Sequence, residues 1–342
     1  MKIEILDKSR YEEYESFLLS CEYSLFYHST KYKDFLEDLL GCESQYLLAY
    51  DNGKLVAALP LMIKNGSLGK VVNSLPYYGS NGGIVCSNTQ SKYSVIFKES
   101  LSLINYTSLT LVSSPFEDGI STLLDKVTDQ RISQITHLNP ASEDYSEYIF
   151  SIIEGSTRRN IKKAQKFGIK VVKKNEEAVS FLEQVHNENM VVIGGKAKSH
   201  AFFEKITKYF LPDIDYKIYV AELNGAPIAA LLVFFYNRTV EYFTPVIRDE
   251  FRDYQPLASI LFEAMKDAMK ANYKYWNWGG TWLTQSGVYQ FKKKWGAIEK
   301  LYNYYTHVRN DEILKVDKYA VAKEYDGFYT YNFNEVDMHA EI

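Results

Sequence analysis

The segment WNWGGTWLTQSGVYQFKKKWGA, residues 276–297, holds residue types suited to binding a ligand. Gly279 and Gly280 follow a short aromatic stretch, and glycine lets the backbone approach a ligand closely. The consecutive lysines of residues 292–294 come at the start of an expected helix and could attract an anion. The tryptophans that could line a cleft are Trp276, Trp278 and Trp282. The same residues also fit a tight turn with aromatic core residues and a solvated lysine cluster.

A second cluster of positive charge lies at mid-chain, in RRNIKKAQKFGIKVVKK, residues 158–174. It holds eight Lys or Arg and no acid, and because the net charge of the chain is −4, the other residues sum to about −12. Arg158 and Lys162 share one face of the expected helix, where like charges disfavour each other. The helix is therefore either solvated or faces an anion. Arg158 and Arg159 are the best candidates for a phosphate, because a guanidinium can bind two oxygens at once.

Local signals predict the boundaries of this basic helix. Ser156 or Thr157 could cap its start, and Gly168 follows its expected end. Residues 169–174, IKVVKK, then read as a strand.

Two hairpins related by an internal repeat are expected to position these motifs. Residues 46–63 resemble residues 219–236, and an offset of 172 without a gap places Asn52-Gly53 on Asn224-Gly225. Each unit is an apolar strand, an Asn-Gly turn and a second apolar strand, and Asn-Gly favours the turn that matches strand twist. Chance similarity between two hairpins is the alternative.

The segments that follow the two hairpins also correspond. We expect a helix and a strand after the first hairpin, at residues 91–104 and 108–114. After the second we expect a strand, a helix that starts at Pro256 and a short strand, at residues 239–247, 256–271 and 273–278. The chain therefore reads as a duplicated α+β unit with mixed, largely antiparallel sheets, divided into residues 1–150 and 151–342.

Composition limits the class of protein. The 342 residues suffice for two domains, and 46% apolar with 24% charged residues is a globular profile. Three cysteines without metal-like spacing suggest a reducing compartment and no disulfide framework. The longest apolar run, residues 226–236, is too short to span a bilayer, and the N-terminus has no signal-peptide core. We expect a cytoplasmic protein without a metal.

The order of elements resembles the acyltransferase fold of the GNAT superfamily. The two motifs together resemble the Fem (FemABX) family of peptidoglycan aminoacyltransferases, whose members look like two GNAT-type domains in tandem. The segment STRRNIKKAQKFGIKV, the glycine pair with the following G-x-Y-x-F-K-x-x-x-G pattern, and SLPYYGSNGGI at 74–84 carry this resemblance. It covers nearly the whole chain and is more specific for the family than for the substrate.

The resemblance implies an activity. In the peptidoglycan enzymes an aminoacyl-tRNA donates an amino acid to the amine of a stem peptide on a nucleotide-linked or lipid-linked sugar. By the same resemblance Lys292 stands beside the reacting ester or binds phosphate, and Arg158 and Arg159 bind phosphate. The long helical arm of the larger members is absent, because residues 175–215 leave room only for about two ordinary helices.

The acyl donor stays open between aminoacyl-tRNA and acyl-CoA, used as a co-substrate without a bound cofactor. Standard GNAT enzymes hold the CoA pyrophosphate on the backbone amides of a glycine-rich loop at a helix N-terminus. This chain has RDYQPLAS at the corresponding place, and Pro256 lacks an amide hydrogen there. We therefore expect that conventional CoA binding is absent.

Acyl transfer from an ester to an amine requires deprotonation of the amine, stabilisation of the oxyanion and alignment of the two substrates. We expect Lys292 to stabilise the oxyanion, without a covalent enzyme intermediate and with no identifiable general base. His28 lies where the family's first domain approaches the acceptor, although a lone histidine is more often structural. The expected substrate-binding residues are Arg158, Arg159, Lys162, His28, Tyr78, Tyr242, Tyr254, Gln255, Tyr289 and Phe291.

The leading hypothesis is amide formation on an amine of a cell-envelope precursor, either a peptidoglycan stem peptide or an amino sugar. One alternative is an acyl-CoA-dependent N-acyltransferase of surface-polysaccharide synthesis. Another is a non-catalytic RNA-binding module that uses residues 158–174, although the acidic remainder of the chain argues against broad nucleic-acid affinity. The expected partners are the sugar precursor and aminoacyl-tRNA, with room for peripheral membrane contact and no role for DNA.

Overall fold

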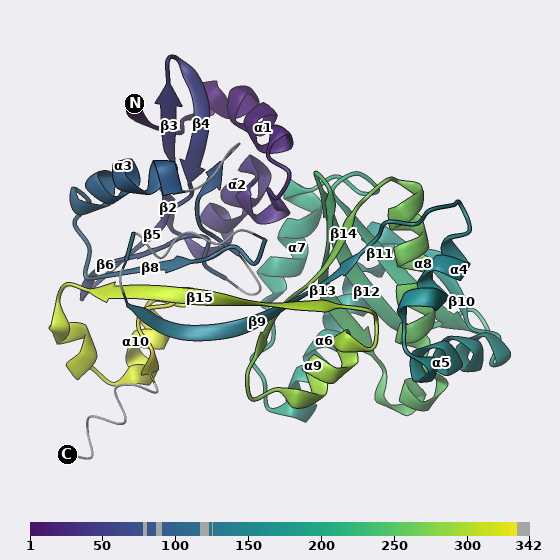
Figure 1. The fold of residues 1–342 in the computed structure, drawn as a ribbon. Coiled ribbons are helices and arrows are strands. Elements are labelled where there is room, and N and C mark those ends of the chain that lie inside the picture. The colour runs from purple at the N-terminus through teal and green to yellow at the C-terminus, as the bar shows by residue number, and fades with distance from the viewer. Residues whose placement is uncertain (78–80, 87–90, 117–122, 125, 334–342) are drawn as a thin grey trace. The chain divides into compact units, whose positions relative to one another are not determined.

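The computed structural model divides the chain into two units at two long strands (Figure 1). It describes residues 1–77, 81–86, 91–116, 123–124 and 126–333. Unit 1 contains Met1–Ile132 and Lys300–Ile342, and unit 2 contains Ser133–Glu299. The strands β9 (Val127–His137) and β15 (Ile298–Val308) each begin in one unit and end in the other. The units therefore divide the chain differently from the expected halves, because the C-terminal segment joins the N-terminal unit.

The duplicated hairpins are confirmed down to their register. In unit 1, β3 (Leu47–Asp51) pairs with β4 (Lys54–Leu59), and in unit 2, β11 (Tyr216–Leu223) pairs with β12 (Ala226–Tyr236). Every residue pair of the first hairpin, shifted by 172, is a pair of the second. The turn residues Asn52 and Asn224 both have positive φ, 50° and 52°, as the predicted turn requires.

The two hairpins also share an irregularity. The register shifts between Ala49 and Tyr50 in the first and between Ala221 and Glu222 in the second, which leaves Val56 and Ile228 as the extra residues of two β-bulges. Val56 and Ile228 are again 172 residues apart. Chance similarity between two hairpins does not explain a bulge at the same repeat position.

Unit 1 holds two groups of strands. The first group has the order β1–β3–β4–β7, and β15, β8, β6, β5 and β2 are consecutive neighbours in the second. The strands not yet bounded are β1 (Lys2–Ile5), β2 (Glu43–Ser44), β5 (Met62–Gly66), β6 (Gly69–Asn73), β7 (Val85–Cys86) and β8 (Ser108–Val112). The helices are α1 (Tyr11–Ser20), α2 (Thr30–Leu40), α3 (Ser91–Ser102) and α10 (Lys318–Glu324). The helix and strand expected after the first hairpin are confirmed as α3 and β8, whereas the β5–β6 hairpin was not expected.

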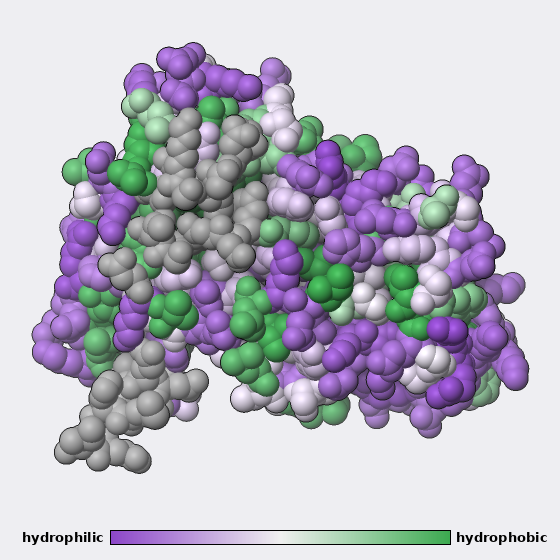
Figure 2. Space-filling view, viewed as in Figure 1, coloured by the Kyte–Doolittle hydropathy of each residue, from purple (hydrophilic) through white to green (hydrophobic). Residues whose placement is uncertain are grey.

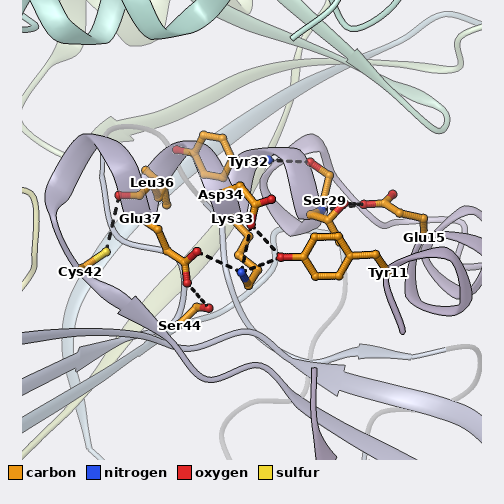
Figure 3. Close-up of polar contacts among 11 residues, drawn as sticks. Tyr11, Glu15, Ser29, Tyr32, Lys33, Asp34, Leu36, Glu37, Cys42 and Ser44 are labelled. Atoms are coloured by element: carbon orange, nitrogen blue, oxygen red, sulfur yellow. Dashed lines mark hydrogen bonds and ion pairs between the residues drawn. The ribbon is translucent and has the colours of Figure 1, made fainter. Parts of the chain in front are cut away.

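A buried lysine ties α1 to α2 in unit 1 (Figure 3). Lys33 is 6% exposed, and its Nζ lies 2.8 Å from the Tyr11 hydroxyl, 3.0 Å from Asp34 and 3.1 Å from Glu37. Burial alone would lower the pKa of Lys33, but the hydrogen bonds to Tyr11 and Asp34 and the charge of Glu37 raise it above its usual value. Lys33 is thus a charged, paired lysine that holds two helices together.

Unit 2 is a sheet with helices on both faces. The strands β10 (Lys170–Lys173), β11, β12, β13 (Thr239–Ile247) and β14 (Tyr275–Trp282) are consecutive neighbours. Its helices are α4 (Tyr145–Ile152), α5 (Gly155–Lys166), α6 (Val179–Ile193), α7 (His200–Tyr209), α8 (Pro256–Lys270) and α9 (Ser286–Lys293). Val233 and Phe235 of β12 pack with α8, and Phe234 contacts Phe210, which follows α7. The alternation follows from the period of two in a strand.

The expected elements of unit 2 are confirmed with one correction. The strand predicted at 239–247 and the helix starting at Pro256 match β13 and α8. The last strand was expected to end at Trp278, but β14 continues through Gly279 and Gly280 to Trp282. Among the described helices of both units, none combines the length and the apolar content needed to cross a bilayer.

The strands β13 and β14 separate where the site is built. The two strands pair in parallel from Thr239, opposite Tyr275, to Glu241, opposite Asn277. Both strands continue for several residues beyond this point. The next residues of the two strands, Tyr242 and Trp278, contact each other with ring centroids 5.0 Å apart.

Candidate active site

Lys292 of α9 is buried against the turned end of β14. Lys292 as a whole is 5% exposed. The amine Nζ lies 2.7 Å from the Thr281 hydroxyl, 3.3 Å from the carbonyl oxygen of Gly280 and 3.4 Å from that of Gly279. An ammonium has three donors, and the structure provides three acceptors. Loss of solvation lowers the pKa of Lys292 to about 8.

Comparison with Lys33 shows how the surroundings of this amine differ from those of a paired lysine. Both lysines are almost fully buried, but Lys33 has carboxylate partners that raise its pKa. Lys292 has only neutral acceptors among the described residues, and its pKa falls. A buried lysine that is not neutralised by a carboxylate is characteristic of a functional site rather than of a structural ion pair.

The glycine pair positions the acceptors of Lys292. Gly279 has a φ of +71°, which lets β14 turn, and the Asn277 side chain accepts a hydrogen bond of 3.0 Å from the Gly279 amide. A Cβ added at Gly279 would meet nothing within 4 Å, so open space lies beside the acceptor carbonyl. Gln134 lies behind Thr281, with its Oε1 3.5 Å from the Thr281 hydroxyl.

Asn277, Thr281 and Gln134 were not selected from the sequence. Asn277 and Thr281 flank the glycine pair, and this adjacency was the available signal. Gln134 lies far away in the chain and gave no signal. Trp276 and Trp278, expected in a cleft, are instead buried in the core at 0% and 2% exposure. Only Trp282 of the three is exposed, at 44%.

The structure brings the two basic motifs together within unit 2. The carbonyl oxygen of Lys294, just after α9, accepts hydrogen bonds from the Glu154 amide at 3.0 Å and the Thr157 hydroxyl at 3.3 Å. Gly296 adopts a φ of +71°, and a Cβ there would lie 2.8 Å from the carbonyl oxygen of Ile152. The start of α5 therefore packs tightly against the end of the α9 motif.

The predicted cap of the basic helix is wrong. The helix α5 starts at Gly155, before both expected caps, and Glu154 occupies the N-cap position without a side-chain cap bond. Thr157 is buried and uses its hydroxyl on Lys294 instead. The predicted end is confirmed, since Gly168 follows the helix with a φ of +75°.

The basic residues of α5 remain candidate anion ligands. Arg158, Arg159 and Lys162 are exposed, and hydrophilic residues dominate the visible surface around α5 (Figure 2). The Arg158 guanidinium donates two hydrogen bonds, of 3.2 and 3.3 Å, to the carbonyl oxygen of Ile153. This contact orients Arg158 at the first turn, and the phosphate-binding role stays a prediction.

Tyr242 lies in β13, and Tyr254 and Gln255 lie in the connection between β13 and α8. Tyr242 packs on Trp278 where the strands separate, and burial raises its pKa. Tyr254 packs on Phe167 at the end of α5, with ring centroids 4.3 Å apart. Gln255 precedes α8 in a left-handed conformation, with a φ of 59°.

Tyr289 and Phe291 belong to α9 with Lys292. The Tyr289 hydroxyl donates to the carboxylate of Glu299, and this hydrogen bond raises the pKa of the phenol. Phe291 is 36% exposed and meets Trp278 edge to face. Phe291 therefore contributes partly exposed apolar surface beside Trp278.

Two of the predicted residues belong to unit 1. His28 is 1% exposed, accepts a hydrogen bond of 2.8 Å from the Leu25 amide through Nδ1, and has its pKa lowered to about 3 by burial. These features match the structural alternative for a lone histidine, and its substrate role stays a prediction. Tyr78 lies outside the described residues.

Comparison with known proteins agrees with this geometry. The family model described as an acetyltransferase (GNAT) domain matches residues 155–293, which include α5, β13, α8, β14 and Lys292. No curated protein sequence matches the chain.

Three solved structures have a similar fold. FemX is 14% identical, with a TM-score of 0.72 over 92% of this chain and 99% of that chain. The C-terminal domain assigned to a lysylphosphatidylglycerol synthetase from Agrobacterium fabrum is 11% identical, with a TM-score of 0.54 over 92% and 96%. A tandem GNAT protein from the clavulanic acid biosynthesis pathway is 9% identical, with a TM-score of 0.50 over 90% and 98%. The expected α+β fold of tandem GNAT-like domains is thus confirmed, with an architecture similar to that of FemX, and the match of residues 155–293 to the acetyltransferase (GNAT) domain supports an acyltransferase.

Proposed function

We propose that this acyltransferase transfers an aminoacyl group from the ester of an aminoacyl-tRNA to an amine of a cell-envelope precursor. The observation that carries the proposal is the buried amine of Lys292, which has three neutral acceptors beside a glycine pair and open space next to Gly279. A positive charge held in a poorly solvated place is suited to stabilising an oxyanion.

The contact lengths suggest how Lys292 would act. The hydroxyl contact of 2.7 Å is strong, whereas the two carbonyl contacts of 3.3 and 3.4 Å lie beyond the usual range for such bonds. The oxyanion of the tetrahedral intermediate can therefore replace a weak carbonyl contact without loss of the Thr281 anchor. Since the pKa of Lys292 is about 8, the amine is mostly protonated at neutral pH and carries the charge that this role needs.

The start of α8 supports an ester donor other than acyl-CoA. In the GNAT fold this helix N-terminus would hold the CoA pyrophosphate. Pro256 has no amide hydrogen, the Gln255 amide donates to Arg252 and the Ala258 amide donates to Gln255. The preceding turn also carries Asp249, Glu250 and Asp253 against one arginine, Arg252, which pairs with Asp249. A pyrophosphate there would find few free donors and a turn with more acids than bases.

The acceptor is inferred from chemistry and from the related folds. The exposed arginines of α5 suit the phosphates of a nucleotide-linked or lipid-linked precursor. FemX and the domain assigned to a lysylphosphatidylglycerol synthetase share the fold, and the name of the latter describes an aminoacylated lipid. We propose a peptidoglycan stem peptide or an amino sugar as the acceptor and the cytoplasm as the place of reaction.

A transfer assay tests the role of Lys292. Purified chain, labelled aminoacyl-tRNA and a nucleotide-linked muropeptide should yield an amide product, and Lys292→Ala should abolish it while the circular dichroism spectrum stays unchanged. Lys270→Ala, at an exposed position of α8, is the matched control and should retain activity. Full activity of Lys292→Ala would remove Lys292 from the mechanism.

The alternative donor is tested separately. The matching family model is described as an acetyltransferase, which favours acetyl-CoA as the second candidate. A thermal shift and product formation with acetyl-CoA, and none with aminoacyl-tRNA, would support the N-acyltransferase alternative. The same GNAT match argues against a non-catalytic RNA-binding module, for which charged, uncharged and unrelated RNA would bind equally well.

A further inference from the structure

Residues 282–288, which lead from the end of β14 into α9, form an exposed segment without charge. Every residue from Trp282 to Val288 is exposed, and the sequence WLTQSGV contains neither an acid nor a base. Trp282, Leu283 and Val288 are 44%, 58% and 43% exposed. Single exposed apolar residues are ordinary on a protein surface, whereas several on one short connection indicate an interaction surface.

The 282–288 segment is an ordered turn joined directly to the Lys292 site. The Gln285 amide donates a hydrogen bond of 3.0 Å to the carbonyl oxygen of Trp282, and this bond closes the turn. Thr281, the residue before the segment, is fully buried and holds the Lys292 amine at 2.7 Å. The exposed apolar side chains therefore begin one residue away from the hydroxyl that anchors Lys292.

Positive charge follows the apolar side chains in the same motif. Residues 276–298 contain the three lysines 292–294 and no acid, and Lys293 is exposed. Two acids have described contacts with α9 or its end. Glu154 donates its amide to the carbonyl oxygen that follows the helix, and the Glu299 carboxylate accepts a hydrogen bond from an α9 tyrosine. An apolar turn followed by lysines is an arrangement that suits a surface of anionic lipid headgroups.

The size of the apolar surface favours a bilayer over a protein partner. A stable protein interface buries about 800 Å² on each partner and involves about 20 residues or more. Three apolar side chains on one turn fall well short of this. Binding to a bilayer surface needs only a few apolar side chains with lysines beside them, and tryptophan is enriched at the level of the headgroups.

We propose that the 282–288 segment and the exposed lysine of α9 dock the chain on an anionic lipid bilayer. Trp282 and Leu283 enter the headgroup region, and Lys293 lies against the anionic headgroups. Because Thr281 connects the segment to Lys292, docking places the Lys292 site at the bilayer surface. The acceptor is then the lipid-linked rather than the nucleotide-linked precursor, a conclusion that rests on the proposed function, whereas the docking does not.

Cosedimentation of the full chain with vesicles tests the docking. Vesicles of phosphatidylcholine and phosphatidylglycerol in equal parts should bind the wild type, and vesicles of phosphatidylcholine alone should bind it at least fivefold more weakly. Leu283→Ser should weaken binding about tenfold, the effect of removing one leucine from an apolar environment. Lys293→Gln should weaken it about fivefold, the effect of one lysine near an anionic surface.

Matched controls exist for both substitutions. Leu103 is 87% exposed in unit 1, and Lys270 is exposed at the end of α8. Leu103→Ser and Lys270→Gln should bind anionic vesicles as the wild type does. Unchanged binding of Leu283→Ser, or equal binding of the wild type to neutral and anionic vesicles, would overturn the proposal.

Tryptophan fluorescence reports the position of the docked segment. The chain has four tryptophans, and Trp276, Trp278 and Trp295 are 0%, 2% and 1% exposed, so the exposed tryptophan is Trp282. Anionic vesicles should shift the emission to shorter wavelength, and brominated lipids should quench it. Trp282→Phe should still sediment with the vesicles but lose the spectral change. A spectral change of the same size in Trp282→Phe would show that the segment does not enter the bilayer.

The consequence for the acceptor is tested by transfer assays. Leu283→Ser should raise the KM for a lipid-linked muropeptide in anionic vesicles at least fivefold and leave kcat and KM for the nucleotide-linked form unchanged. An equal loss with both acceptors would overturn the choice of the lipid-linked precursor. The vesicle measurements need no acyl donor, so they test the docking even if the chain proves inactive in transfer.

Two other occupants of the segment would give different results. A dimer in analytical ultracentrifugation that Leu283→Ser dissociates, without vesicle binding, would assign the segment to a second copy of the chain. Affinity for tRNA that falls in Leu283→Ser, again without vesicle binding, would assign it to the donor. Either result would overturn docking on a bilayer.

Discussion

Replacement of Lys292 by methionine tests the physical state of the buried amine apart from catalysis. Methionine keeps the length and the apolar stem of the side chain but removes the charge. In the wild type the folded pKa is about 8, below the usual value of about 10.4. Between these two values the unfolded chain binds more protons than the folded chain, so Lys292 makes stability rise with pH.

The size of this effect follows from the two pKa values. Between pH 7 and pH 9.5, Lys292 should increase the wild-type free energy of unfolding by about 2 kcal/mol, since one pKa unit corresponds to about 1.4 kcal/mol. Lys292→Met lacks this contribution. The stability of the variant relative to the wild type should therefore fall by about 2 kcal/mol over the same range, whatever hydrogen bonds the substitution removes.

Urea unfolding of both proteins at the two pH values measures this difference. All other titrating groups occur in both chains and cancel, and Lys270→Met provides a control at an exposed lysine of the same unit. A stability difference between wild type and Lys292→Met that stays constant within about 0.5 kcal/mol would show that the amine is not desolvated, and the argument for its role would lose its basis. Transfer by Lys292→Met should meanwhile fall by about 100-fold or more, as for loss of an oxyanion donor.

Three further predictions follow from the contacts described. Lys33→Met should lower the free energy of unfolding by about 2 kcal/mol in urea titrations, because Asp34 and Glu37 lose their counter-ion, and a stabilised variant would contradict this. Gly296→Ala should lower it by about 2 kcal/mol, because the methyl group meets the Ile152 carbonyl oxygen and the backbone has positive φ, whereas Gly287→Ala should have a small effect. The pH profile of the wild-type transfer rate should decline above about pH 8, as Lys292 loses its proton, and an unchanged rate up to pH 10 would exclude a charged lysine in the rate-limiting step.

The sequence predicted the elements that local chemistry determines. The Asn-Gly turns, the apolar strands beside them and the proline at the start of α8 led to correct strands, helices and register. These features depend on residues close together in the chain. The repeat strengthened the prediction of these strands and turns, because the same pattern of strand, Asn-Gly turn and strand occurs in both hairpins.

Features that depend on distant contacts were not predictable in this way. The run of three lysines does not show which amine is buried, because that depends on where β14 turns at Gly279. The prediction of the α5 cap was wrong because the Thr157 hydroxyl donates to the carbonyl oxygen of Lys294, a residue more than a hundred positions away. The return of residues 300–342 to unit 1 likewise follows from long-range strand pairing, such as Tyr304 opposite Val112.

The bulges at Val56 and Ile228 bear on the history of the chain. An extra residue interrupts the strand pairing at one point, and bulges of this kind are kept within families of related domains. The neighbouring strands of the two hairpins differ. In its sheet β4 pairs with the two-residue strand β7, whereas β12 pairs with the nine-residue strand β13. A shared bulge at this position is what two copies of one hairpin would both retain while their surroundings diverged.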